Sequence, residues 1–202
     1  MRQLIISQSS YHDLAINASP TKRCHGEMLD RILDIMNYMD NTHSKVFFVR
    51  LDFRFSADYI VPPGNQVFVD FLENFIQNLK RLGLDPYRFW VREQSTLERP
   101  HYHVCIFLNG NKIQSIGGLH QKATELWGFA LNRDATGLVW DCTKDRHGNP
   151  QENGIMIRRG APDYEATFQA CYYWASYLAK TRSKELIPNG VKSFGSSQIP
   201  GM

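Results

Sequence analysis

The sequence predicts an α+β fold in which a central antiparallel sheet carries packed helices. Apolar segments rich in β-branched and aromatic residues alternate along the chain with segments whose apolar residues recur at helical spacing. Some of the expected strands are joined by short, hairpin-like connections, which is typical of antiparallel pairing. A chain of 202 residues with 43% hydrophobic residues can fill one core, so we expect a single domain over 1–202.

Four helices are predicted from the period of the apolar residues. Met28 to Met39 form one apolar stripe, and Phe68 to Leu82 form a second stripe that Gly83 ends. A third helix has weak starting signals and contains Gly117-Gly118, whereas the fourth is rich in alanine and lacks glycine and proline from Phe168 to Lys180. The predicted ranges are 26–41, 68–82, 113–127 and 166–184.

Five strands are predicted between and around these helices. The first is long and is followed by the breaker Pro62-Pro63-Gly64-Asn65, and the third ends at the turn signal Asn109-Gly110-Asn111. Two short edge strands flank a polar insert at 145–153. The predicted strand ranges are 46–55, 87–93, 101–108, 137–140 and 154–158. We expect residues 1–22 to form an irregular arm and residues 187–202 a loosely structured tail.

Charge and cysteine usage restrict the class of protein. A formal net charge of +3 permits a nucleic-acid partner without requiring one. The four cysteines are far apart and form no C-x-x-C pair, so neither a zinc ribbon nor a disulfide scaffold is indicated, and reduced thiols in a cytoplasm are the simplest account. No secretory signal pattern opens the chain and no apolar run reaches the length of a membrane span, so we expect a cytoplasmic protein without a membrane partner.

Two histidines stand one residue apart at the start of an apolar strand, in the run from Arg99 to Leu108. Alternate side chains of a strand share a face, so His101 and His103 point the same way while Tyr102 points to the other face. Two adjacent imidazoles form half of a divalent-metal site. The alternative is an exposed polar strand face.

Glu93 is the candidate third ligand of such a site. It ends the preceding predicted strand, and the polar connection to the histidine strand makes a hairpin that places its carboxylate beside the two imidazoles. Gln94 would face the opposite side of the sheet, so the two residues are alternatives and not partners. The other interpretation of Glu93 is an exposed charge at the end of a strand.

Tyr173, Tyr177 and Lys180 share one stripe of the fourth predicted helix, through spacings of four and then three residues. A phenol is a poor nucleophile at its free pKa near 10, and a nearby ammonium or metal favours the negative charge that develops on it during phosphoryl transfer. The alternative is that these aromatic residues are core packing.

Together these segments resemble the HUH endonucleases that initiate rolling-circle replication. The resemblance rests on His101-Tyr102-His103 with an upstream glutamate, followed by Tyr173-x-x-x-Tyr177-x-x-Lys180, and it spans about 46–194. It is nearest to the two-tyrosine branch, and in particular to the inovirus gene-two-protein-like family of filamentous phages and their chromosomal relatives. The strand 46–53 loosely matches the first motif of that superfamily, and residues 1–45 carry no family signature.

The resemblance implies a ferredoxin-like or RRM-like core and a division of roles. Mg²⁺ or Mn²⁺ would be held by three metal ligands, which are Glu93, His101 and His103. Tyr177 would attack a phosphate of single-stranded DNA and leave a 5′-phosphotyrosine and a free 3′-hydroxyl, while Lys180 stabilises the developing charge or orients the phosphate. Tyr173 would be the second nucleophile, although a small shift in helix phase would exchange its role with that of Tyr172.

The implied partners are a single-stranded DNA origin with a hairpin and the helicase and polymerase of a bacterial host. Arg50, Arg54 and Arg182 are candidate DNA contacts, with a solvated surface as the alternative. Two other functions stay open at this point: a relative that binds DNA without cutting it, and a metal-dependent hydrolase that uses water as the nucleophile.

Overall fold

The computed structural model describes residues 4–94, 99–145, 147–182 and 186–201. Its centre is a six-stranded antiparallel sheet in the order β10-β6-β7-β5-β8, with β9 pairing β5 as well. The strands are β5 (Lys45–Arg54), β6 (Tyr87–Glu93), β7 (His101–Asn109), β8 (Val139–Trp140), β9 (Ile155–Arg158) and β10 (Phe194–Ser196). The predicted α+β fold with an antiparallel sheet is confirmed.

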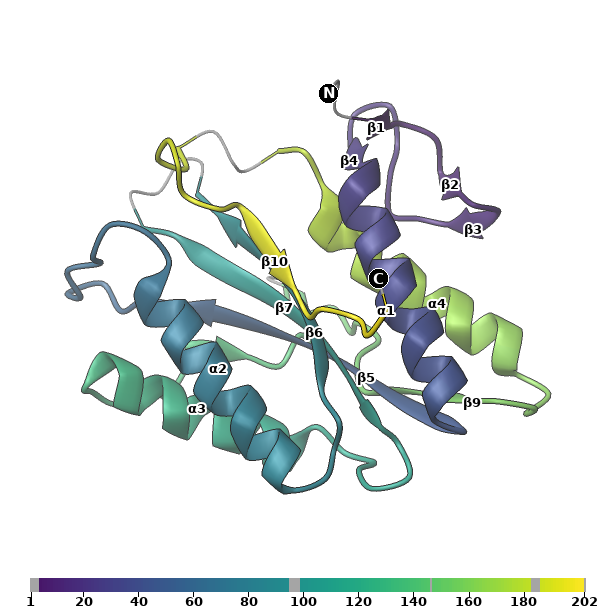
Figure 1. Ribbon diagram of the computed structural model, residues 1–202. Helices are drawn as coiled ribbons and strands as arrows, with labels where there is room; N and C mark the ends of the chain where they lie inside the picture. Colours follow the sequence, from purple (N-terminus) through teal and green to yellow (C-terminus); the bar gives the residue numbers. More distant parts are fainter. Residues whose placement is uncertain (1–3, 95–98, 146, 183–185, 202) are drawn as a thin grey trace.

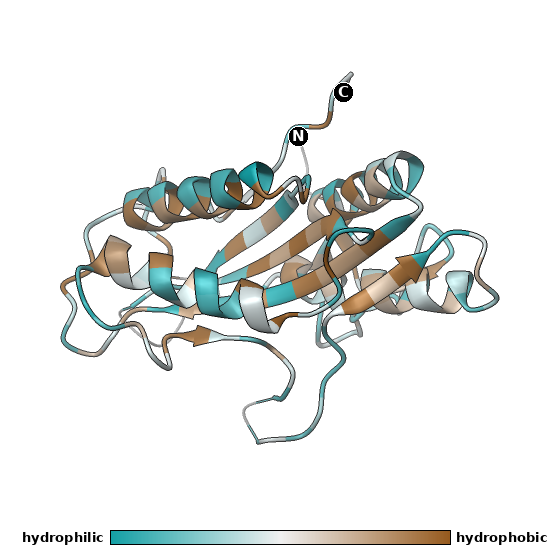
Figure 2. Cartoon of the chain, turned by 90° about the horizontal axis from the view of Figure 1, so that it is seen from below, coloured by the Kyte–Doolittle hydropathy of each residue, from teal (hydrophilic) through white to brown (hydrophobic). Residues whose placement is uncertain are grey.

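Four helices cover the two faces of this sheet (Figure 1). They are α1 (Gly26–Thr42), α2 (Gln66–Arg81), α3 (Gly117–Leu131) and α4 (Tyr164–Ser176). The core under α2 and α3 includes Phe53, Phe68 and Trp127, whereas the core under α1 and α4 includes Phe48 and Tyr172. Hydrophobic strand segments lie in the interior in Figure 2, because a sheet covered on both faces needs apolar side chains on both. Within the described residues, no helix is both long and apolar enough to span a bilayer.

The last helix is shorter than the predicted range 166–184. It ends at Ser176, and a 3₁₀ turn, η1, continues over Tyr177–Ala179. Lys180 then has extended backbone, forms a β-bridge with Cys24, and is followed by a hydrogen bond from Thr181 N to Arg23 O. The extended N-terminal chain thus offers backbone partners that compete with further helix. Residues 183–185 lie outside the described residues.

The first and last described segments are more ordered than the sequence predicts. Residues 4–25 form short strands, which are β1 (Ile5–Ile6), β2 (Ser10–Tyr11), β3 (Leu14–Ala15) and β4 (Cys24–His25). They are held by burial of Ile6 and Ile16 in the core under α1 and α4. In the predicted loose tail, β10 pairs with β6 and Phe194 stacks on Phe89 at 5.7 Å between ring centroids. Long-range pairing and burial, which local sequence does not reveal, supply the order.

Candidate metal centre and its tyrosine

The antiparallel register of three neighbouring strands brings the predicted ligands together. Glu93 of β6 is directly opposite His101 of β7, and His103 of β7 is directly opposite Asp52 of β5. Cross-strand partners share a face of the sheet, so all four side chains project toward the layer of α1 and α4. Gln94 accepts a hydrogen bond from Arg92 on the opposite face, as the strand alternation predicts.

The carboxylate of Glu93 lies between the two imidazoles. Its Oε2 is 3.2 Å from His101 Nε2 and 3.3 Å from His103 Nε2, and one ligand atom from each residue lies within 4.8 Å of the others. Glu93 and His103 are buried, whereas 27% of the His101 side chain is exposed. The three donors therefore converge in a site that is closed on the sheet side and accessible beside His101.

Asp52 fixes the orientation of His103. The His103 Nδ1–H group donates to Asp52 Oδ1 at 2.6 Å, so Nε2 is the nitrogen that faces Glu93. Burial alone would lower the pKa of His103, but the carboxylates of Asp52 and Glu93 outweigh it and raise that pKa to about 10. Burial would likewise raise the pKa of Asp52, yet the charges of His103 and Arg50 hold it below its usual value. Histidines that bind metal ions often donate their other ring N–H group to a carboxylate, which fixes the orientation of the imidazole.

This donor set fits a divalent metal ion. His103 Nε2 is buried and, within the described residues, has no aligned hydrogen bond, although it lies close to Glu93 Oε2. Two imidazole nitrogens and one carboxylate oxygen suit several divalent first-row metals, and the remaining positions of such an ion would be open to a ligand. The group of Glu93, His101 and His103 can therefore hold a metal ion, whose identity these three donors do not fix.

Tyr177 and Lys180 lie against the same centre. The Lys180 ammonium is 2.8 Å from Glu93 Oε1 and donates to the Tyr177 hydroxyl at 2.7 Å. The Tyr177 ring is edge-on to the His103 ring, with 5.9 Å between centroids. A 3₁₀ turn repeats every three residues, so side chains three apart lie above one another. The short turn η1 thus explains why Tyr177 and Lys180 meet.

The charges of the cluster compensate one another in a buried setting. Burial would raise the pKa of Glu93, but its close contacts with the imidazoles of His101 and His103 and the charges of His103 and Lys180 hold it far below its usual value. Glu93 is therefore a carboxylate at neutral pH. An ionised carboxylate is the form that binds a metal ion.

Tyr172 and Tyr173, the other tyrosines considered as nucleophiles, lie in different surroundings. Tyr172 is fully buried in the core under α1 and α4, and burial raises the pKa of its hydroxyl well above the usual value. Tyr173 is 37% exposed, and its ring packs edge-on against Trp174. Within the described part of the chain, no hydrogen bond joins Tyr173 to the three candidate ligands.

The predicted DNA contacts lie at different places. Arg50 is buried on β5, where its Nη2 donates to Gln151 Oε1 at 3.0 Å and its guanidinium lies 5.0 Å from the Trp174 ring centroid. Arg54 is exposed and directly opposite His101. Arg182 is exposed just after η1.

Asp52 is the residue at this centre that the sequence interpretation did not assign. Its signal was present, since Arg50, Asp52 and Arg54 are polar residues on alternate positions of an otherwise apolar strand. Pairing Asp52 with His103 required knowing that β5 lies next to β7.

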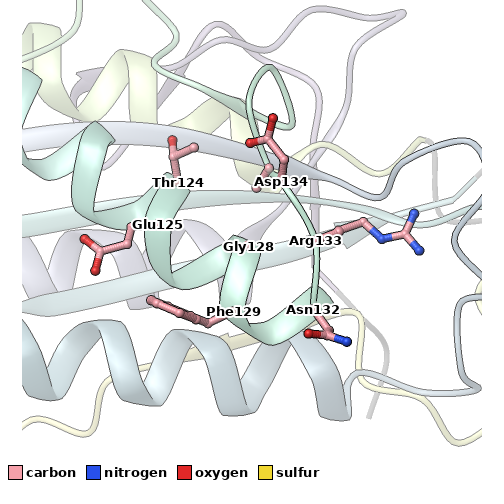
Figure 3. Close-up of a pocket in the computed structure, with 8 residues that line it drawn as sticks. Thr124, Glu125, Gly128, Phe129, Asn132, Arg133 and Asp134 are labelled. Carbon is pink, nitrogen blue, oxygen red and sulfur yellow. The ribbon is translucent and has the colours of Figure 1, made fainter.

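A hollow of about 410 Å³ lies elsewhere, at the end of α3 (Figure 3). It is lined by Thr124, Glu125, Gly128, Phe129, Asn132, Arg133, Asp134 and Ala135. Helix α3 packs on the opposite face of the sheet from Glu93. The hollow is therefore separate from the candidate metal centre.

Comparisons with known proteins place the chain in a family without a stated activity. The "Uncharacterized protein YagK" of Escherichia coli (strain K12) is 28% identical over 119 residues, which cover 54% of this chain and 53% of that protein. The match thus spans about half the length of this curated relative. No solved structure matches the chain. The family model of the YagK/YfjJ C-terminal domain matches residues 8–197, and the chain therefore belongs to the YagK/YfjJ C-terminal domain family.

Proposed function

We propose that this chain is a metal-dependent endonuclease of the HUH type, which nicks single-stranded DNA and joins it to Tyr177. The observation that carries the proposal is the contact of Lys180 with both Glu93 Oε1 and the Tyr177 hydroxyl, at 2.8 and 2.7 Å. One cation thereby ties the potential nucleophile to the candidate metal ligands. Core packing alone would not require a tyrosine hydroxyl and a buried ammonium at this position.

The chemistry assigned to each residue follows from its contacts. A metal ion held by Glu93, His101 and His103 would supply a Lewis acid for the non-bridging oxygens of one phosphate. Asp52 keeps His103 oriented, and Lys180 stabilises negative charge on the phenolic oxygen of Tyr177. These positions prepare Tyr177 for attack on a phosphodiester.

The proposed reaction transfers a DNA phosphate from a 3′-oxygen to the phenolic oxygen of Tyr177. The Tyr177 oxygen loses its proton and forms a bond to phosphorus, while the bond from phosphorus to the 3′-oxygen breaks. The 3′-oxygen takes up a proton and leaves as a hydroxyl, which can prime a polymerase. The other strand end stays attached to the protein as a 5′-phosphotyrosine, as in initiation of rolling-circle replication of a filamentous-phage-like element.

The experiment uses single-stranded oligonucleotides tiled over the DNA that flanks the gene, incubated with the purified protein and Mn²⁺ or Mg²⁺. We expect a 3′-labelled fragment to migrate with the protein on a denaturing gel, and a 5′-labelled fragment to be released with a free 3′-hydroxyl. Tyr177→Phe should remove the adduct. Tyr164→Phe is the matched control, because Tyr164 lies on α4 but its hydroxyl donates to Asp40 Oδ2.

Three results would contradict this function. Cleavage without an adduct would favour a hydrolase that uses water, and binding without cleavage would favour a DNA-binding relative. An adduct that forms equally well in Tyr177→Phe would show that another residue attacks. Because the phenol-to-phenyl change is nearly isosteric, a lost activity would report chemistry rather than packing.

A further inference from the structure

Trp140 is a large aromatic side chain that the sheet leaves exposed beside the candidate metal centre. It pairs directly with Asp52, and Asp52 pairs in turn with His103, so the three side chains share one face of the sheet. Its neighbour Val139 points to the other face and is buried in the core under α3. Trp140 nevertheless remains 47% exposed.

The indole of Trp140 is held in place by the following loop. Its Nε1–H group donates to the carbonyl oxygen of Lys144 at 3.0 Å. The polar edge of the ring is therefore satisfied, and the ring itself is an ordered apolar surface in contact with solvent. Neighbouring strands lie about 4.8 Å apart, so the backbone of Trp140 is roughly 10 Å from that of His103 across β5.

Two exposed cationic side chains, those of Arg54 and Lys144, lie near the Trp140 ring in the strand pairing and in the following loop. Arg54 is exposed and pairs with His101, and it lies two residues along β5 from Asp52, the partner of Trp140. Within the described residues its side chain forms no ion pair. Lys144, whose carbonyl holds the indole, is also exposed. The charge of Asp52, which pairs with Trp140 on the neighbouring strand, is already paired with His103.

We propose that Trp140 and Arg54 form a subsite for the single-stranded DNA next to the scissile phosphate. Trp140 stacks on one base and Arg54 contacts a backbone phosphate, the combination with which proteins hold single strands without strict sequence preference. The subsite rests on the proposed function for its substrate. The subsite also gives the path of the DNA. The single-stranded DNA leaves the metal centre over β5 toward β8, away from β6, which carries Glu93.

Binding to a fluorescein-labelled oligothymidylate, measured by anisotropy in EDTA, tests the subsite without cleavage. Trp140→Ala should weaken binding about tenfold, and Trp140→Phe should keep most of the affinity because it retains a stacking face. Arg54→Ala should weaken binding. It should also reduce the slope of log affinity against log salt concentration by the amount expected for about one phosphate contact. Phe129→Ala is the matched control, since Phe129 is 72% exposed but lies on α3.

The outcomes separate the subsite from the nicking activity. If the wild-type protein does not bind the oligonucleotide, or if Trp140→Ala binds as tightly as the wild type with an unchanged urea midpoint, the subsite is wrong. An equal loss of affinity in Phe129→Ala would also overturn it. If Trp140→Ala and Arg54→Ala both weaken binding while no metal-dependent adduct forms on any oligonucleotide, the subsite stands and the proposed nicking function fails.

Discussion

Two polar clusters lie back to back on the hairpin of β6 and β7, and they are built differently. On one face, both terminal nitrogens of Arg92 donate to acceptors on Gly64, Asn65, Tyr102 and Gln94. On the other face, three potential metal ligands converge while His103 Nε2 has no aligned hydrogen bond among the described residues. In the first cluster, both terminal nitrogens of Arg92 have acceptors, as in a structural network, although its Nε–H group has no hydrogen-bond partner among the described residues. The second gathers three side chains that can bind one metal ion.

This difference shows why a buried polar group is not by itself evidence of function. Arg92 and Glu93 are adjacent, equally buried and both charged, yet their partners differ in kind. The contacts of Arg92 fix the entry to α2 through Gly64 and Asn65. The contacts of Glu93 connect it to two imidazoles and an ammonium. The comparison can be tested by variants on each face.

Removal of His101 should have the largest effect on metal binding. His101→Ala deletes a ligand that is partly exposed, so we expect affinity for Mn²⁺ to fall by more than about 100-fold, beyond the loss typical of supporting residues. Stability should change by less than about 1 kcal/mol, because Glu93 keeps its contact with Lys180. Calorimetric titration with Mn²⁺ and urea unfolding measure the two effects. Unchanged affinity would place the metal site elsewhere.

Loss of the support behind His103 should have the next largest effect. Asp52→Asn keeps the shape of the side chain but removes the charge that orients the His103 Nδ1–H group. We expect a decrease of about 10- to 100-fold in Mn²⁺ affinity, as for other residues behind metal ligands. The same titration checks this value. A variant that binds like the wild type would mean that His103 does not depend on Asp52 for its orientation.

The opposite cluster should respond in stability and not in metal binding. Arg92→Met removes the hydrogen bonds that Arg92 donates to Gly64, Asn65 and Gln94, which should cost about 1–3 kcal/mol of unfolding free energy. Affinity for Mn²⁺ should stay within about twofold of the wild type, because Arg92 faces away from Glu93. Urea unfolding and the titration together measure the contrast. If Arg92→Met abolished metal binding in a folded protein, the two clusters would not be independent.

Tyr173→Phe should have the smallest effect on first cleavage. Tyr173 is partly exposed and its ring packs on Trp174, so we expect the rate of initial nicking to stay within about twofold of the wild type. Its predicted role is the second transfer, which should be impaired. A strand-transfer assay with two labelled oligonucleotides separates the steps. If transfer is unaffected, Tyr173 is not the second nucleophile.

Local patterns predicted much of this site because its parts obey short-range rules. Strand alternation places His101 and His103 on one face, and the hairpin brings Glu93 opposite His101. The role of Asp52 depends on the pairing of β5 with β7, which joins segments that are far apart in the sequence. Strand β10 likewise exists through its pairing with β6. The end of α4 at Ser176 depends on the bridge between Cys24 and Lys180.

The most direct test of the account is to identify the residue that carries the DNA. Mass spectrometry of peptides from the Mn²⁺-dependent adduct should find the 5′-phosphate on Tyr177, whose hydroxyl contacts Lys180. The adduct should be absent in EDTA and in His101→Ala. A DNA phosphate on the buried Tyr172, a first attachment at Tyr173, or an adduct that forms equally without metal would contradict the central claim.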